Sequence, residues 1–222
     1  SGGGFAVWVG DGPHAVRDRS RRGGRPTADW DAMPGLFALG LVPAFPGPLV
    51  RQYTGRHRSV YLETVESIRS VLSFGHSRFR AKVVLVTSAE HAEGKTTFAL
   101  SLAANTGRGG QRALVIDCDI RNPSAMRVMG ALSVPHDSQM PVDPLLAGLE
   151  RDVLPGVDIL TPAGMAQREG RAMLSPEEVR RILAQVSSQY DLILLDTPPA
   201  LAFPDAAVLS RLARMGRGQD GL

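Results

Sequence analysis

A glycine, a lysine and two threonines follow an apolar run in the stretch from Val83 to Thr97, VVLVTSAEHAEGKTT. The run VVLV is apolar and mostly β-branched, which is typical of a buried strand. Gly94-Lys95-Thr96-Thr97 leads into the apolar-periodic segment FALSLAA, which predicts a helix. Strand, loop, Gly-Lys-Thr and helix form the layout of a phosphate-binding loop, because backbone N–H groups and the positive end of the helix surround the phosphates.

The lysine and the first threonine have separate chemical tasks in such a loop. We expect Lys95 to reach the β- and γ-phosphates and the Thr96 hydroxyl to ligate Mg²⁺. Lys82 and Lys95 are the lysines among 25 basic residues, the others being arginine, so a compact ammonium group stands where a phosphate loop needs one. The expected nucleotide-binding residues are contiguous: Ala89, Glu90, His91, Ala92, Glu93, Gly94, Lys95, Thr96 and Thr97.

The alternative to a phosphate loop is an ordinary strand-to-helix turn that happens to carry a helical lysine. The strict pattern has a glycine five residues before Gly94, and this chain has Ala89 there. The two interpretations remain open from this stretch alone.

Two further strands are predicted to end in acidic residues. ALVID places Asp117 at its end, with Asp119 and Arg121 directly beyond, and LILLD ends at Asp196. Ligands of an open parallel sheet bind beyond the carboxyl ends of its strands, and Mg²⁺ prefers oxygen ligands. Each aspartate alone is equally explained as a cap or turn former, but together with the phosphate loop they predict one Mg²⁺–phosphate site.

Strands and helices alternate from Lys82 onward, which predicts an α/β fold with a parallel sheet and helices on both faces. Strands are expected at 83–87, 113–117, 157–160 and 191–196, and helices at 95–106, 124–129, 144–149, 175–188 and 205–214. Residues 131–155 are otherwise expected to be irregular. Ser175, Pro176 and Glu178 predict the start of their helix, with serine at the cap and acid against the positive helix end.

The chain before the core divides into two parts. Residues 1–35 are rich in Gly, Arg and Asp, and we expect a disordered linker there. Residues 36–80 form a connector, with a strand expected at 36–41 and an amphipathic helix at 59–74, and residues 81–222 form the nucleotide-binding domain. The basic runs RDRSRRGGR and RQYTGRHR are solvated linker or a segment attracted to anionic lipid. They lack the interleaved aromatic residues that favour nucleic acid.

Cysteine usage and the first residue bound the cellular context. Cys118 is the single cysteine, which excludes a disulfide within the chain and fits a reducing cytosol. The sequence begins with Ser1, and we expect a fragment of a longer protein.

Three segments, TSAEHAEGKTT, LVIDCDIRNPS and YDLILLDTPPALAFPDA, resemble in order the motifs of the bacterial tyrosine kinases (BY-kinases) of capsule and exopolysaccharide synthesis. These kinases lie within the deviant-Walker P-loop ATPases, which include ParA- and MinD-like proteins. The resemblance covers about residues 36–212, and Asp-x-Asp-x-Arg-x-Pro after a strand is its most specific element. It implies a three-layer P-loop NTPase fold with a mostly parallel central sheet, truncated at the C-terminus.

The resemblance also implies roles for single residues. Lys95 and Thr96 would bind phosphate and Mg²⁺, and Asp119 and Asp196 would hold Mg²⁺, partly through water. Asp117 would orient or deprotonate the attacking tyrosine hydroxyl. The expected catalytic residues are Asp117, Lys95 and Arg121, and the expected metal ligands are Thr96, Asp119 and Asp196.

The helix before the core departs from the family pattern. The family carries Glu-x-x-Arg-x-x-Arg there, which contributes to ring assembly, whereas this chain has Glu63, Glu66 and Arg69. The charge reversal at Glu66 puts ring contacts through this helix in doubt.

The C-terminal part departs as well. The family has a tyrosine-rich tail as phosphoacceptor, but no tyrosine follows Asp196 here, and Tyr190 is expected to pack in the core rather than to be phosphorylated. The chain stops at MGRGQDGL, where the family continues into another apolar strand, so we expect a missing strand and an open sheet edge.

The resemblance thus implies an ATP- and Mg²⁺-dependent protein-tyrosine autokinase that regulates capsular or exopolysaccharide polymerisation and export at the cytoplasmic face of the cell membrane. Its expected partners are a transmembrane polysaccharide co-polymerase or activator segment, in the same or a separate chain, the polysaccharide synthesis machinery and further copies of itself, but no nucleic acid. One alternative is a ParA- or MinD-like ATPase switch. Proteins of that group usually carry a second lysine early in the phosphate loop, and the absence of one here argues against this alternative. The other is a truncated, non-catalytic nucleotide-binding or docking domain.

Overall fold

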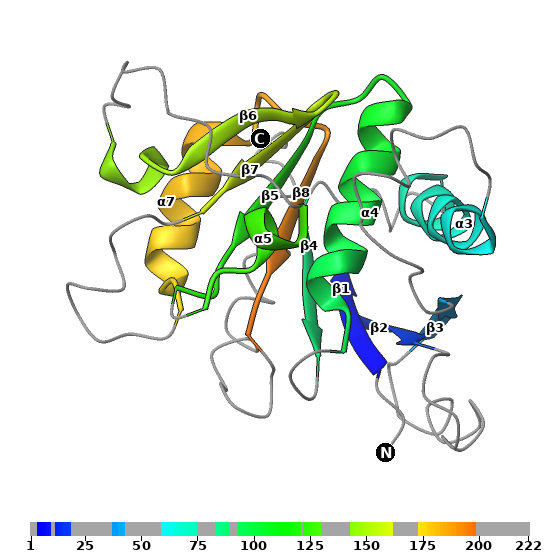
Figure 1. Ribbon diagram of the computed structural model, residues 1–222. Helices are drawn as coiled ribbons and strands as arrows, with labels where there is room; N and C mark the ends of the chain where they lie inside the picture. Colours follow the sequence, from blue (N-terminus) through cyan, green and yellow to red (C-terminus); the bar gives the residue numbers. More distant parts are fainter. Residues whose placement is uncertain are drawn as a thin grey trace, which may run out of the picture.

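One mixed sheet of eight strands runs through the molecule, in the order β3-β2-β1-β4-β8-β5-β7-β6 (Figure 1). The computed structural model describes residues 4–9, 12–18, 37–42, 59–74, 83–88, 93–120, 122–129, 143–161 and 173–198. The strands are β1 (Gly4–Val9), β2 (Gly12–Asp18), β3 (Phe37–Val42), β4 (Val83–Ser88), β5 (Ala113–Asp117), β6 (Leu149–Leu154), β7 (Val157–Leu160) and β8 (Leu192–Asp196). The helices are α3 (Val60–Phe74), α4 (Lys95–Arg108), α5 (Ala125–Met129), the short 3₁₀ helix η2 (Pro144–Leu146) and α7 (Pro176–Val186).

The centre of the sheet is parallel, as the alternation of strands and helices predicts. β8 lies between β4 and β5 and is parallel to both, and β5 is parallel to β7. Every residue of β5, β7 and β8 is buried, because helices cover a parallel sheet on both faces. The sequences ALVID, VDIL and LILLD are accordingly almost continuously apolar and end in, or contain, single aspartates.

Each face of the sheet has its own apolar core, since successive strand residues point to opposite faces. Val84 of β4 packs in one core with Phe98 of α4 and with residues of α3 and α5. Leu85 packs in the other core with Ile182 of α7. Figure 1 shows α7 on one side of the sheet and α3 and α4 on the other. The predicted three-layer arrangement is confirmed.

The start of α7 has the predicted cap. The Ser175 hydroxyl accepts a hydrogen bond from the Glu178 backbone N–H (3.3 Å), and Glu178 Oε2 accepts one from the Ser175 N–H (2.7 Å). Pro176 occupies the first turn. This reciprocal pair satisfies backbone donors that the helix itself leaves unpaired.

No helix in the described part of the chain is long and apolar enough to cross a membrane.

The N-terminal residues that the sequence predicts to be disordered include two strands, so that prediction is wrong for 4–9 and 12–18. β1 and β2 pair antiparallel, with Val9 opposite Gly12. Two residues, Gly10 and Asp11, separate these partners, and a Gly-Asp pair between strands is a hairpin signal. The glycine- and arginine-rich composition around the short apolar run FAVWV obscures that signal.

The hairpin extends the sheet beyond β4. β1 pairs antiparallel with β4, so β4 has a neighbour on each side and is not an open edge. The end strands of the described sheet are β3 and β6. The predicted helix at 205–214 lies outside the described residues.

Residues 149–154 form the edge strand β6, although the sequence predicts irregular structure there. The strand pairs antiparallel with β7, and its register shifts between Glu150 and Leu154. Within it, Asp152 has a positive φ of 48°. Charged side chains and a bulge keep an edge strand from pairing with another chain, and they also hide the apolar alternation from which a strand is predicted.

A buried carboxylate joins the strands at their amino ends. Asp158 of β7 has no exposed surface, and its Oδ2 accepts hydrogen bonds from the Tyr190 hydroxyl (2.5 Å) and the Arg112 guanidinium (2.7 Å). Its Oδ1 accepts from the Asp152 backbone N–H (2.9 Å). The pKa of Tyr190 is raised above its ordinary range, mainly by burial and secondly by the hydrogen bond to Asp158. The cluster therefore ties β5, β6, β7 and the entry to β8 together.

Asp158→Ala should lower the free energy of unfolding by about 3 kcal/mol, because it leaves a buried phenol and a guanidinium without their partner. The measurement is urea unfolding followed by circular dichroism. The matched control is Glu177→Ala, which removes an exposed ion pair with the same 2.7 Å N–O distance, Arg180 to Glu177. The control should stay close to the parent, and equal losses in the two variants would contradict a special role for the buried cluster.

Candidate functional site

The phosphate loop ends at a glycine whose backbone only glycine adopts readily. Gly94 has φ 89° and stands at the cap position of α4, where no side chain caps the helix. The first turn of α4 contains no acidic residue. Backbone N–H groups at an uncapped helix start, together with the positive end of the helix dipole, favour an anion. This is the arrangement that the Gly-Lys-Thr motif predicts.

The Thr96 and Lys95 side chains both meet the last residue of β8. Thr96 Oγ1 donates a hydrogen bond to Asp196 Oδ2 at 2.6 Å, and Lys95 Nζ lies 3.9 Å from Asp196 Oδ1. In the sheet, Asp196 stands opposite Val86 of β4 and Asp117 of β5. The parallel register therefore brings the carboxyl end of β8 against the start of α4, as the strand-end positions predict.

Asp196 is a buried carboxylate with one oxygen that accepts no hydrogen bond among the described residues. Its exposed fraction is 1%, and Oδ1 has no hydrogen-bond partner among the described residues. Burial raises the pKa of Asp196 to about 7, with Lys95 opposing the shift and Asp117 adding to it. A buried acceptor without a donor costs stability, so the site is built for a further positive group.

Asp117 organises the loop that follows β5. Its Oδ2 accepts hydrogen bonds from the backbone N–H groups of Ser124 (2.7 Å) and Ala125 (2.9 Å), and its Oδ1 accepts one from Asp119 (3.2 Å). The side chain has no exposed surface. Burial raises the pKa of Asp117, and the three backbone hydrogen bonds oppose that shift. Asp117 thus caps α5 from the end of β5, the strand that precedes this helix in the chain.

Asp119 is only partly buried and lies on the same loop. Its Oδ1 accepts a hydrogen bond from the Asn122 N–H (2.9 Å), and its backbone forms an isolated bridge with Met173. The Leu174 N–H donates to the Cys118 carbonyl at 3.1 Å. The segment that enters α7 therefore holds the loop of Asp119 in place from the other side.

Some predicted site residues lie outside the described part of the chain. These are Ala89, Glu90, His91, Ala92 and Arg121. Of the remaining nucleotide-binding residues, Glu93 is buried, Gly94 is exposed, and Thr97 is partly buried. The site therefore brings Lys95, Thr96, Asp117 and Asp196 together, while Asp119 lies on the adjoining loop.

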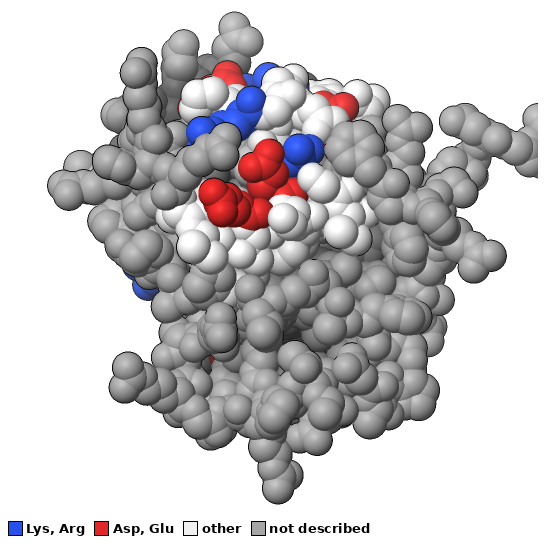
Figure 2. Space-filling view, turned by 90° about the vertical axis from the view of Figure 1, so that its right-hand side faces the viewer, with Lys and Arg blue, Asp and Glu red and all other residues white. Residues whose placement is uncertain are grey.

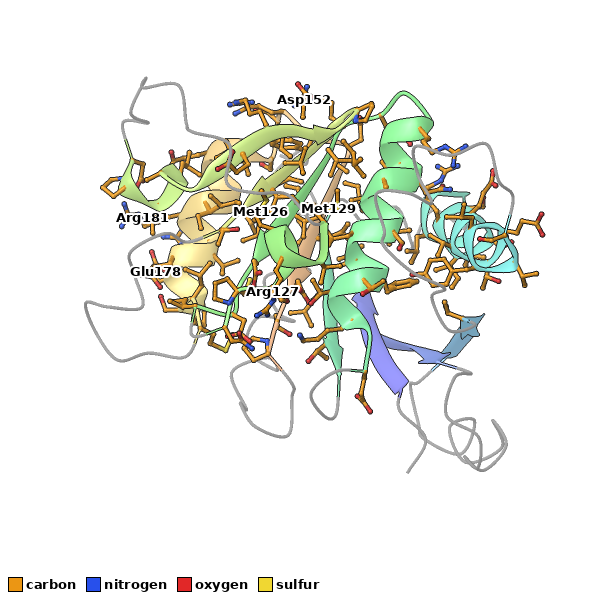
Figure 3. All side chains as sticks on the ribbon, viewed as in Figure 1. Met126, Arg127, Met129, Asp152, Glu178 and Arg181 are labelled. Carbon is orange, nitrogen blue, oxygen red and sulfur yellow. The ribbon has the colours of Figure 1, made fainter. Side chains whose placement is uncertain are left out.

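One site residue, Ser124, is not predicted as such from the sequence. Its Oγ lies 3.0 Å from Thr96 Oγ1, which joins the loop after β5 to the start of α4. The sequence signals a short helix start at this serine, and a cap role explains it without any reference to the phosphate loop. α5 itself lies over the sheet, with Met126 and Met129 toward the apolar core (Figure 3).

The donors at this edge fit a hard divalent cation. Thr96 offers a hydroxyl and Asp196 an unpaired carboxylate oxygen, which are ligand types that Mg²⁺ accepts while keeping several waters. Within the described ranges, no group of three or more His, Cys, Asp or Glu side chains is arranged as a metal site. Thr96 and Asp196 would supply two ligands of such an ion, and phosphate oxygens and water would supply others.

The raised pKa of Asp196 predicts a pH-dependent stability of the nucleotide-free protein. Because the folded pKa, about 7, lies above the ordinary value of 3.8, the folded state binds more protons between these values. The corresponding stabilisation is complete at low pH and is lost as pH rises through about 7. Between about pH 5 and pH 8 the melting temperature should fall by several degrees more than in Asp196→Asn. Parallel pH curves for the two proteins would contradict this.

The sequence is similar to bacterial tyrosine kinases over most of its length. It is 30% identical over 164 residues to the tyrosine-protein kinase wzc of Salmonella typhi, covering 71% of this chain and 22% of that protein. It is 29% identical over 162 residues to the tyrosine-protein kinase YwqD of Bacillus subtilis, covering 70% of this chain and 66% of that protein. The chain therefore spans about a fifth of the first relative. No model of a protein family matches the sequence.

Solved structures share the fold. The chimerical protein CapA2B2 superposes with a TM-score of 0.65 at 21% identity, covering 85% of this chain and 82% of the other. The kinase domain of the Escherichia coli tyrosine kinase ETK superposes with a TM-score of 0.52 at 24% identity, covering 75% and 72%. The sequence similarity thus identifies the chain as a domain of the bacterial tyrosine kinase family, and the superpositions show the P-loop fold that its motifs predict.

Proposed function

We propose that this chain is the catalytic domain of an ATP-dependent protein-tyrosine kinase. The observation that carries the proposal is that Lys95 and Thr96 both contact the Asp196 carboxylate, whose Oδ1 accepts no hydrogen bond among the described residues. This supplies an ammonium group, a hydroxyl and a carboxylate at the start of a helix, which are the groups that bind the phosphates and metal of ATP. The similarity to proteins named tyrosine-protein kinases supports tyrosine as the acceptor.

The phosphate-binding groups would act mainly by position and charge. The N–H groups at the start of α4 and the Lys95 ammonium would hold the β- and γ-phosphates, and Thr96 and Asp196 would hold Mg²⁺, with Asp119 adjacent. When bound, Mg²⁺ would neutralise charge on the phosphate oxygens. The phenol oxygen of the acceptor forms a bond to the γ-phosphorus while the bond to the β-phosphate oxygen breaks. The products are phosphotyrosine and ADP, and the phenol proton is released to water.

For Asp117 we propose orientation rather than proton abstraction. Its carboxylate is fully buried, and both oxygens accept backbone hydrogen bonds from the loop after β5. A base must reach the proton that it abstracts. Asp117 would therefore act by holding Asp119 and Ser124 in place. The role of Arg121, which lies outside the described residues, stays a prediction.

The acceptor tyrosine would lie outside the core. Tyr61 and Tyr190 are 4% and 3% exposed, and their hydroxyls contact Ser101 (2.9 Å) and Asp158 (2.5 Å). Neither phenol can approach a bound γ-phosphate without leaving its apolar core. We propose that the acceptor is Tyr53, which lies outside the described residues, a tyrosine of a segment beyond this sequence, or a tyrosine of another chain.

The proposal includes the partners and location implied by the resemblance: the cytoplasmic face of the membrane, a transmembrane activator segment and the polysaccharide synthesis machinery. A ring that assembles through α3 is not part of it. Arg69 of α3 donates to Asn105 of α4 at 2.6 Å, while Glu63 and Glu66 are exposed. Figure 2 faces the side of the molecule on which α3 lies, where acidic side chains lie beside basic ones.

Lys95→Ala should abolish phosphotyrosine formation in the presence of Mg²⁺ and ATP, because the γ-phosphate loses its positive partner. Phosphotyrosine is read by mass spectrometry of tryptic peptides on protein shown to be folded by circular dichroism. Lys82→Ala, at the other lysine of the chain, is the matched control and should behave like the parent. Activity retained in Lys95→Ala would count against a kinase site at this edge.

A parent protein that releases phosphate from ATP and dimerises, but forms no phosphotyrosine, would favour the ATPase switch. A folded parent that binds no nucleotide would favour the docking domain.

Tyr61→Phe and Tyr190→Phe should each keep full phosphotyrosine content, since neither hydroxyl is within reach of the site. Tyr190→Phe should also lower the melting temperature by a few degrees, because Asp158 loses a hydrogen bond in a buried position. The same mass spectrometry identifies the modified peptide. Loss of the signal in either variant would place the acceptor in the core and contradict the proposed geometry.

A further inference from the structure

Ser124 stands at the cap position of α5 but does not use its hydroxyl as a cap. A serine at that position ordinarily accepts a hydrogen bond from an N–H of the first turn. Here the carboxylate of Asp117 accepts from the N–H groups of Ser124 and Ala125 instead. The Ser124 hydroxyl is thereby released from the helix and lies 3.0 Å from Thr96 Oγ1.

The direction of the hydrogen bonds between these hydroxyls follows from their proton count. A hydroxyl has one proton and two lone pairs. When Asp196 is ionised, the Thr96 proton is donated to Asp196 Oδ2 at 2.6 Å, so Thr96 accepts from Ser124. The chain of donors runs from Ser124 to Thr96 to Asp196. One lone pair of Thr96 accepts from Ser124, and the other remains for a cation.

We propose that Ser124 is a positioning residue for metal-dependent nucleotide binding: its hydroxyl fixes the rotation of the Thr96 hydroxyl, so that the remaining lone pair faces the metal position. This inference rests on the proposed function, because it assumes that Thr96 and Asp196 hold Mg²⁺ with ATP. It assigns Ser124 no contact with the substrate.

The same hydrogen bond couples two segments that are distant in sequence. Ser124 belongs to the loop that Asp117 organises, and Thr96 belongs to the first turn of α4. Without the Ser124 donor, Thr96 keeps its bond to Asp196 but loses the second contact that selects one rotation of its hydroxyl. Metal affinity falls, whereas the backbone N–H groups and Lys95 continue to bind phosphate. The expected signature is a loss confined to the Mg²⁺-dependent part of binding.

The experiment compares ATP affinity with Mg²⁺ and with excess EDTA by isothermal titration calorimetry. Ser124→Ala should lower ATP affinity about tenfold with Mg²⁺, which corresponds to one hydrogen bond, and should leave affinity in EDTA unchanged. Ser124→Thr keeps the hydroxyl and should retain the affinity of the parent. Ser101→Ala, which removes a buried hydroxyl elsewhere on α4, is the matched control and should not alter the ratio of the two affinities.

Each outcome decides for or against the inference. Equal affinities of Ser124→Ala and the parent in Mg²⁺ would overturn it, and so would equal losses with Mg²⁺ and with EDTA, since these indicate a general structural effect. If Ser124→Ala does not fold, Ser124→Cys carries the test, because a thiol fills the space but donates weakly. A parent that binds Mg²⁺–ATP but forms no phosphotyrosine, either on itself or on an added tyrosine-containing protein, removes the kinase proposal and leaves the Ser124 result readable. A parent that binds no nucleotide removes both.

Discussion

The contacts of the Asp196 carboxylate are the constraint on which the rest of the site depends. A charged group at the end of a central strand has lost its water, and only nearby donors can compensate for it. The parallel register of β8 with β4 and β5 delivers it to the start of α4, where Thr96 and Lys95 meet it. The compensation is partial, because Oδ1 has no hydrogen-bond partner among the described residues. That deficit is what favours a cation at this edge.

At the amino ends of the strands, a second buried carboxylate has hydrogen-bond donors that compensate for its lost hydration. Asp158 is also fully buried, but a phenol, a guanidinium and a backbone N–H all donate to it. In Figure 3, Asp152, whose N–H is that donor, is labelled at the top of the molecule, above Arg127 of α5. Asp158 therefore contributes to the stability of the sheet, whereas Asp196 contributes to the candidate binding site. A satisfied buried network holds strands in register, while an unsatisfied carboxylate is retained for what it binds.

The sequence predicts the centre of this molecule well because its signals are local. Apolar strands that end in aspartate, and Gly-Lys-Thr before a helix, are enough to predict that Thr96 and Asp196 meet. The hairpin of β1 and β2 is missed because a Gly-Asp turn signal is weak beside an arginine-rich composition. Ser124 is missed for a different reason. Whether a serine at a helix start caps that helix depends on whether another side chain already accepts from the same N–H groups. Here Asp117, the last residue of the preceding strand β5, does so.

Cys118 gives this edge of the sheet a built-in chemical reporter. It is the single cysteine of the chain, has no exposed surface, and lies between Asp117 and Asp119. Burial raises the pKa of its thiol well above the ordinary value, so the thiol is unreactive toward alkylating agents while it stays buried in the folded protein. Alkylation then requires local opening of the segment that carries the acidic residues. The rate of alkylation reports the free energy of that local opening. A ligand that bridges the phosphate loop and this segment would lower the alkylation rate.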